Sequence, residues 1–188
     1  MRKFGILFLF LFSTIIIAGC YGIMHDQITY SISPEYFTKF KYEQFGFEPA
    51  WFGGHRQTVA VIGFLATWWM GLIIGFILGL VALVFPDHRL MGKGLRKAII
   101  LVFCIAICAG LIGWLYGRFY LSHTQVNWWL PEDLVNRKAF ITVGSIHNFS
   151  YLGGLLGIIA GIIYLVWLRI SNRVKSKDAV LKPHILKD

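Results

Sequence analysis

The sequence predicts an all-α membrane protein whose four transmembrane helices form one bundle. Three observations support this fold class: 57% of the 188 residues are hydrophobic, only 14% are charged, and the apolar residues gather in four long stretches. Each stretch is long enough, at about 1.5 Å per residue, to cross a hydrocarbon core of about 30 Å. Because the stretches lack the alternation of barrel strands, we expect them to cross the membrane as helices.

The predicted domain organisation is a single integral membrane domain over residues 1–188, with spans at residues 4–23, 59–85, 98–121 and 146–170. The remaining segments form two loops on one side of the membrane and a short loop and a tail on the other: 24–58 and 122–145, then 86–97 and 171–188. No span contains Asp or Glu. This absence argues against a proton pump or an ion carrier that works through the bilayer centre.

The distribution of basic residues predicts the orientation. Twelve of the 18 lysines and arginines lie at the N-terminus, in the loop 86–97 and in or just before the tail. Because basic residues gather in cytoplasmic segments, this side is the cytoplasm, and both termini lie there. The chain is then a multi-pass protein of a bacterial inner membrane, and the lipid bilayer rather than nucleic acid explains its positive charge.

The first span has two interpretations. The opening MRK, an apolar run and the sequence IAGC up to Cys20 resemble a lipoprotein signal, in which Cys20 would be acylated after cleavage. The apolar character continues past Cys20 to Met24, which favours a retained helix. In both interpretations the residues that follow emerge on the exoplasmic side.

Internal similarity predicts two duplicated two-helix units. The sequence HDQ at residues 25–27 resembles HTQ at residues 123–125, and three glycines of the second span recur in the fourth after 82 residues. Glycines four residues apart form a stripe on one helix face that permits close backbone approach. We therefore expect the second and fourth helices to form the inner pair of the bundle, packed through Gly71, Gly75, Gly79, Gly153, Gly157 and Gly161.

A short helix should follow the first span. Ser33 can cap it, Pro34 suits its first position, and Glu35 complements its positive end, which predicts an interfacial helix over residues 34–41. Just before it, the alternation of residues 28–32 indicates a short extended segment. We expect an aromatic cap on the exoplasmic side that includes Tyr30, Glu35, Tyr36, Phe37, Phe40 and Glu132.

One histidine marks the exoplasmic end of each span: His25, His55, His123 and His147. Imidazole is the commonest transition-metal ligand, and Asp26 offers a carboxylate oxygen in the same layer. These residues predict a metal or haem site for redox chemistry or metal handling. The alternative, which we favour from the sequence, is a non-enzymatic module whose aromatic cap binds a lipid or a membrane or periplasmic protein, with the histidines as interfacial residues.

Signatures of common enzymes do not occur in the sequence. It has no phosphate-binding glycine loop, GxSxG, HExxH or CxxC motif, and no catalytic residue stands out.

The segments YGIMHDQITYSISPEYFTKFKYEQFG and SIHNFSYLGG resemble an uncharacterised family of small bacterial four-helix inner-membrane proteins with the signature HDQxTYxISPEYFT. The resemblance implies a bacterial inner-membrane location and assigns no activity to any residue.

Overall fold

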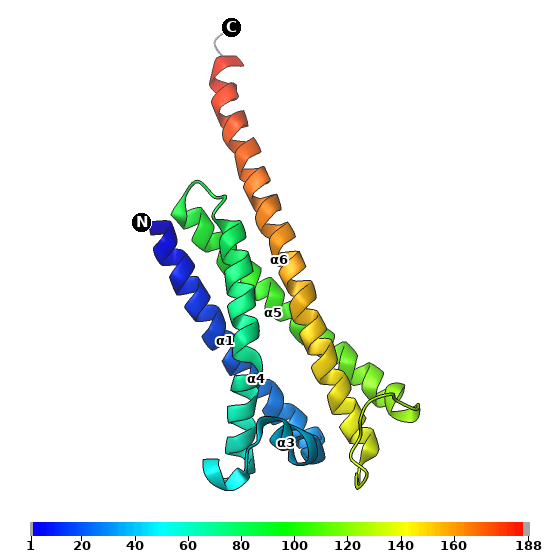
Figure 1. Cartoon of the computed structure of the whole chain (residues 1–188). Helices are drawn as coiled ribbons and strands as arrows, with labels where there is room; N and C mark the ends of the chain where they lie inside the picture. Colours follow the sequence, from blue (N-terminus) through cyan, green and yellow to red (C-terminus); the bar gives the residue numbers. More distant parts are fainter. Residues whose placement is uncertain (1, 186–188) are drawn as a thin grey trace.

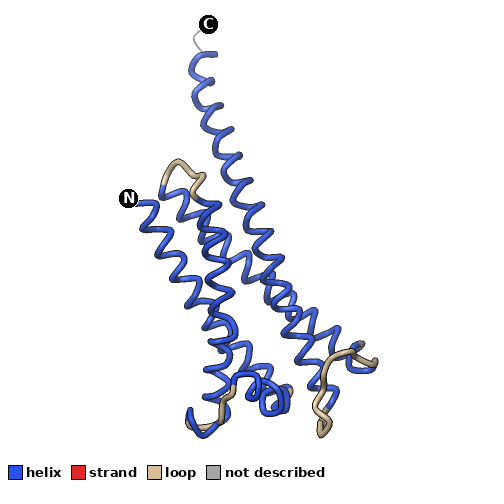
Figure 2. The backbone as a smooth tube through the Cα atoms, in the orientation of Figure 1, coloured by secondary structure: helices blue, strands red, loops and turns tan. Residues whose placement is uncertain are grey.

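The computed structural model describes residues 2–185, which form helices and connecting loops with no strand (Figures 1 and 2). The long helices are α1 (Arg2–Ile32), α4 (His55–Ala82), α5 (His88–Phe119) and α6 (Arg137–Ile185). The short elements are α2 (Pro34–Tyr36), η1 (Phe37–Lys41), α3 (Tyr42–Phe45), η2 (Pro49–Phe52) and η3 (Leu121–His123). Each long helix contains a stretch long and apolar enough to cross a membrane, which confirms the all-helical, four-span prediction.

The helices are longer than the predicted spans. α1 continues to Ile32 and α6 begins at Arg137, so both extend into segments that the sequence suggested were loops. The prediction of an extended segment at residues 28–32 was wrong, because these residues form the last turns of α1. Adding residues to an existing helix costs little, and the Thr29 and Ser31 hydroxyls donate to carbonyls one turn earlier, at 3.1 and 3.0 Å.

The long helices form two pairs, in which α1 packs mainly against α4 and α5 mainly against α6 (Figure 1). The N-terminus and the turn between α4 and α5 lie at one end of the bundle, which we call the basic end. The opposite end, which we call the cap end, holds residues 33–54 and 120–136. Buried residues of all four helices form the core toward the basic end, among them Phe10, Leu78, Leu95 and Leu165.

At the basic end, charged side chains form hydrogen bonds with backbone groups near the ends of α4 and α5. The Lys3 ammonium donates to the Phe85 carbonyl just past α4, and the Arg169 guanidinium donates to the Val84 carbonyl at 3.1 Å. The Asp87 carboxylate accepts from the first free backbone N–H groups of α5, those of Arg89 and Leu90, at 3.0 Å each. Positive charge at a helix C-terminus and an acidic N-cap both satisfy backbone groups that the helix leaves free.

The glycine stripes do not join α4 to α6 as an inner pair, so that expectation was wrong. Gly71, Gly75 and Gly79 face α1, where their nearest neighbours include Thr14, Leu11 and Leu7. Gly153 and Gly157 face α5, and only Gly161 lies against α4, beside Leu78. Each glycine-rich helix therefore packs against the long helix that precedes it in the chain. The stripe predicted close packing, but its partner depends on the tertiary arrangement.

A pair of glycines that the sequence did not single out makes the closest approach between α1 and α4. A Cβ atom at Gly22 would meet the Gly63 carbonyl oxygen, and a Cβ at Gly63 would meet the Gly22 carbonyl oxygen. Only residues without a side chain permit this contact.

Cleavage before Cys20 would remove the part of α1 that supplies Phe10 and Thr14 to the core, which favours the retained helix. Cys20 itself is exposed on the outer surface.

We predict that Gly22→Leu destabilises the protein by about 1–3 kcal/mol or more, because the new side chain forces α1 and α4 apart. Thermal unfolding in mild detergent, followed by circular dichroism, measures the loss. Gly5→Leu is the matched control on the same helix, since no atom lies within 4 Å of a Cβ built at Gly5. Equal stability of the two variants would contradict the close contact.

Candidate functional site

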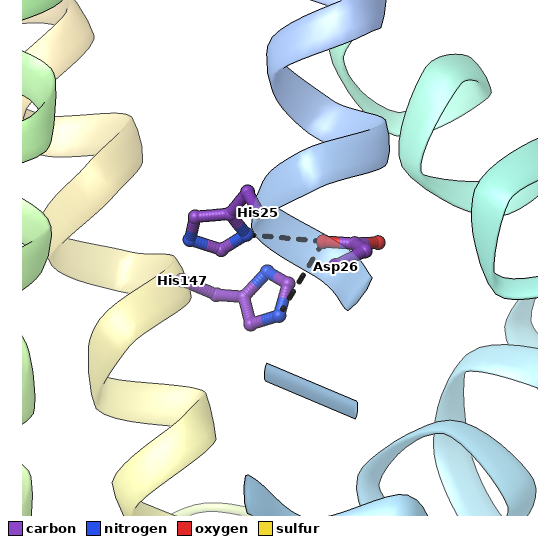
Figure 3. Close-up of side chains that lie close together, drawn as sticks. All are labelled: His25, Asp26 and His147. Carbon is purple, nitrogen blue, oxygen red and sulfur yellow. Dashed lines mark hydrogen bonds and ion pairs between the residues drawn. The ribbon is translucent and has the colours of Figure 1, made fainter. Parts of the chain in front are cut away.

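Three of the residues proposed from the sequence as metal ligands meet inside the bundle near the cap end (Figure 3). His25 and Asp26 come from α1, and His147 comes from α6. The Asp26 Oδ1 atom lies 3.1 Å from His25 Nδ1 and 3.8 Å from His147 Nε2. All three candidate ligand atoms lie within 4.8 Å of one another.

Helical spacing explains why these side chains share one site. Tyr21, His25 and Thr29 recur every four residues along α1, so they lie on one face of this helix. His147 and Ser150 lie three residues apart on the facing side of α6. The His25 Nε2 atom is 3.2 Å from the Ser150 hydroxyl oxygen, and the Thr29 hydroxyl oxygen is 3.4 Å from His147 Nε2. Tyr21 and Thr29 were not predicted as site residues, although their spacing from His25 would have indicated them.

The Asp26 carboxylate is the most unusual group of the site. Asp26 is only 2% exposed, and its Oδ2 atom is buried without a hydrogen-bond partner among the described residues. A buried carboxylate is costly unless positive charge or hydrogen-bond donors compensate it. His25 supplies one contact, to Oδ1. The second oxygen remains available to another donor or to a cation.

A second buried charged side chain, that of Lys41, lies in the segment that covers the site. Its ammonium lies over the rings of Phe40 and Phe45, 5.8 Å from each centroid, in the geometry of a cation–π contact. Burial lowers the pKa of Lys41, while the Asp26 carboxylate acts in the opposite direction.

Aromatic residues of the predicted cap close the site from the cap end. Tyr36 is 7% exposed and Phe37 is fully buried, while Tyr30 and Phe40 are half-buried. The Tyr36 ring stacks on the His147 ring with centroids 5.0 Å apart and an interplanar angle of 18°. Burial raises the pKa of the Tyr36 hydroxyl well above its ordinary value. We call residues Pro34–Phe45 the roof, because Tyr36 and Phe37 lie buried beside the site.

The roof folds inward because of two local features. Residues Phe37–Lys41 form a π-helical turn, a wider turn that often occurs at functional sites. The Glu35 carboxylate accepts hydrogen bonds from the backbone N–H groups of Val135 and Asn136, at 2.9 and 2.7 Å, and pairs with Lys39 at 3.0 Å. These bonds fasten the roof to the loop that leads into α6. Glu132, placed in the cap from the sequence, is exposed in that loop.

The site faces a small cavity and an apolar groove. The cavity has a volume of about 70 Å³, and its polar lining comes from Tyr21, His25, Asp26, His147, Ser150 and Tyr151. The groove, of about 760 Å³, lies between α1 and α5 and is lined largely by apolar side chains such as Ile17, Met24 and Leu111. His25 and Ser150 line both spaces. The site is therefore closed toward the cap and borders the apolar side of the bundle.

The other two histidines of the predicted layer lie apart from this cluster. His55 is exposed; its Nδ1 atom is 3.1 Å from the Tyr42 hydroxyl, whose pKa burial raises to about 12. His123 is also exposed, and its Nδ1 atom is 3.2 Å from the Ser122 hydroxyl. The predicted layer thus separates into a buried pair and two peripheral histidines. The separation arises because α1 continues beyond His25, whereas α5 ends before His123.

We predict that Glu35→Gln lowers the free energy of unfolding by about 1–2 kcal/mol at neutral pH, because glutamine retains only one of the two acceptor oxygens. Hydrogen bonds, chiefly from Val135, hold the pKa of Glu35 below its usual value of 4.5. A lowered carboxyl pKa adds stability above that usual value, and this stability is lost as the pH falls through the lowered pKa.

The measurement is thermal unfolding of the two proteins at neutral pH and below pH 4.5. The difference between wild type and Glu35→Gln should shrink in acid. Glu43→Gln, at an exposed position of the same segment, is the control and should leave the unfolding curve unchanged. A difference that stays constant with pH would contradict the role given to the Glu35 carboxylate.

Two imidazoles and one carboxylate are a ligand set that zinc and non-haem iron sites use. In such sites a second hydrogen bond often fixes the orientation of a ligating imidazole. Ser150 can do this for His25, because its hydroxyl lies beside Nε2, whereas Nδ1 faces Asp26. Comparison of the chain with protein-family models, with curated proteins and with solved structures found no match.

Proposed function

We propose that this protein binds a divalent transition-metal ion of the zinc or ferrous class through His25, Asp26 and His147. The observation that carries the proposal is a buried carboxylate that lies close to two imidazoles and has one oxygen without a hydrogen-bond partner in the described part of the chain. A bound cation would compensate the buried negative charge. Metal handling within the membrane is then the function that the site supports best.

Two of the distances between the candidate ligand atoms are close to those of a metal site. Bonds of about 2.0–2.1 Å in tetrahedral coordination place neighbouring ligand atoms roughly 3.3–3.4 Å apart. The distances of 3.1 Å and 3.8 Å from Asp26 Oδ1 to the two histidines lie close to this value. Small side-chain rotations would bring His25 and His147 into the same coordination shell.

The cavity provides a free coordination position. Its volume of about 70 Å³ exceeds the roughly 10–15 Å³ that one water molecule needs. A water or another small ligand can therefore complete the coordination shell beside Tyr21 and Tyr151. We propose an ion rather than haem because a carboxylate beside two imidazoles is a ligand set typical of zinc and non-haem iron.

We also infer that the basic end faces the cytoplasm of a bacterial cell and that the two helix pairs are duplicated units. The excess of Lys and Arg at the basic end supports the orientation. The matched contacts of Gly71 with α1 and of Gly153 with α5 support the duplication, because each glycine packs on the preceding helix of its own pair. The metal site then lies near the exoplasmic boundary of the membrane.

Metal binding is tested with protein purified in mild detergent. Wild type is incubated with Zn²⁺, or with Fe²⁺ under anaerobic conditions, freed of excess metal and measured by elemental analysis. We predict about one ion per chain, and an affinity that falls at least about tenfold in Asp26→Asn and His147→Ala because each variant loses a ligand. Ser150→Ala should weaken binding about tenfold by releasing the His25 ring.

Histidines outside the cluster provide matched controls. His55→Ala and His123→Ala should retain the ion, because both residues are exposed and distant from Asp26. Circular dichroism and gel filtration verify that every variant is folded. The proposal would be overturned if wild type bound no metal at saturating Zn²⁺ and Fe²⁺. It would also be overturned if the control variants lost as much bound metal as Asp26→Asn and His147→Ala.

The orientation is tested by cysteine labelling in a variant that lacks the native cysteines. We predict that Glu48→Cys, at the exposed cap end, reacts with a membrane-impermeant maleimide in spheroplasts. Lys93→Cys, exposed at the basic end, should react only after the membrane is permeabilised. The reverse labelling pattern would contradict the proposed topology.

A further inference from the structure

We propose that a groove at the basic end binds one anionic diacyl phospholipid of the phosphatidylglycerol type. The groove lies between α1 and the first turns of α5, away from the metal site, and has a volume of about 610 Å³. Pockets that hold small molecules commonly measure about 300–1,000 Å³. The inference does not depend on the metal proposal, because the two sites share no residue.

The groove has an apolar wall and a basic rim. Apolar side chains of α1 and α5 line its length: Ile6, Leu9, Phe10, Ile17, Leu95 and Ile99. Arg89, Lys93 and Arg96 line its rim. These three residues are spaced four and three positions apart, so they lie along one face of α5. The arrangement suits a lipid whose acyl chain follows the apolar wall while its phosphate meets the rim.

The basic residues of the rim have no ion-pair partner among the described residues. None of the ion pairs among the described residues involves Arg89, Lys93 or Arg96, and all three residues are exposed. Asp87 is the nearest acidic residue in the sequence, but its carboxylate caps α5 and contacts His88 at 3.2 Å. Asp87 therefore offsets part of the charge of Arg89, while Lys93 and Arg96 leave the rim with positive charge at the position of a lipid headgroup.

The charge of the rim selects the class of lipid. A phosphatidylglycerol headgroup has a net negative charge, whereas a phosphatidylcholine headgroup carries its own cation close to the phosphate. Each Lys or Arg close to an anionic membrane surface strengthens binding to the anionic lipid by about fivefold. Three such residues on one face predict a strong preference for the anionic lipid, and the apolar wall distinguishes this lipid from a soluble phosphate compound.

The test is native mass spectrometry of the full chain in mild detergent, after titration with dioleoylphosphatidylglycerol or dioleoylphosphatidylcholine. We expect wild type to retain one phosphatidylglycerol molecule at least tenfold more strongly than phosphatidylcholine. Lys93→Gln should reduce the retention about fivefold, because it removes one charge of the rim. Lys97→Gln is the matched control: it removes the same charge from an exposed position of α5 that does not line the groove.

A second variant tests the groove without changing its charge. Gly92 lines the groove, and the nearest atom to a Cβ built there is Ile6 Cδ1 at 3.9 Å, so Gly92→Phe fills open space. This variant should lose lipid retention while it keeps the unfolding temperature of the wild type. Equal retention of both lipids, equal effects of Lys93→Gln and Lys97→Gln, or full retention in Gly92→Phe would overturn the proposal.

Discussion

The burial of the Asp26 carboxylate is the constraint on which the cap end of this protein depends. An ion of this size that loses its water shell costs several kcal/mol unless its surroundings compensate the charge. Here His25 on the same helix contacts one oxygen at 3.1 Å, the His147 ring lies 3.8 Å from that oxygen across the bundle, and the other oxygen has no partner among the described residues. One carboxylate therefore has neighbours on both α1 and α6.

Tight packing within the first helix pair shapes the rest of the bundle. The backbones of α1 and α4 touch at Gly22 and Gly63, and glycine stripes bring Gly71 and Gly75 against the same helix. α1 contacts α5 far less closely than α4. Both large grooves, one beside His25 and one at the basic end, lie along this looser boundary between α1 and α5. Close packing on one face of α1 thus leaves binding space on another.

Much of the architecture follows from composition, whereas the site depends on the folded chain. Apolar length gives the spans, because a membrane admits few other structures. The end of α1 was not predictable from apolar length, because His25, Asp26 and Gln27 look like the start of a loop although the helix continues through them. The partner of each glycine stripe and the inward fold of Tyr36 and Phe37 are tertiary properties. Helical spacing of Tyr21, His25 and Thr29 was the available local signal for the site.

The stack of Tyr36 on His147 has a kinetic consequence. The roof that carries Tyr36 is held at one end by α1 and fastened by Glu35 to the loop before α6. An ion bound as proposed would be covered on the cap side by the roof and by the Tyr36 ring. Its equilibrium affinity would then depend on His25, Asp26 and His147, and its exchange with the cap side on the contacts that hold Pro34–Phe45 in place.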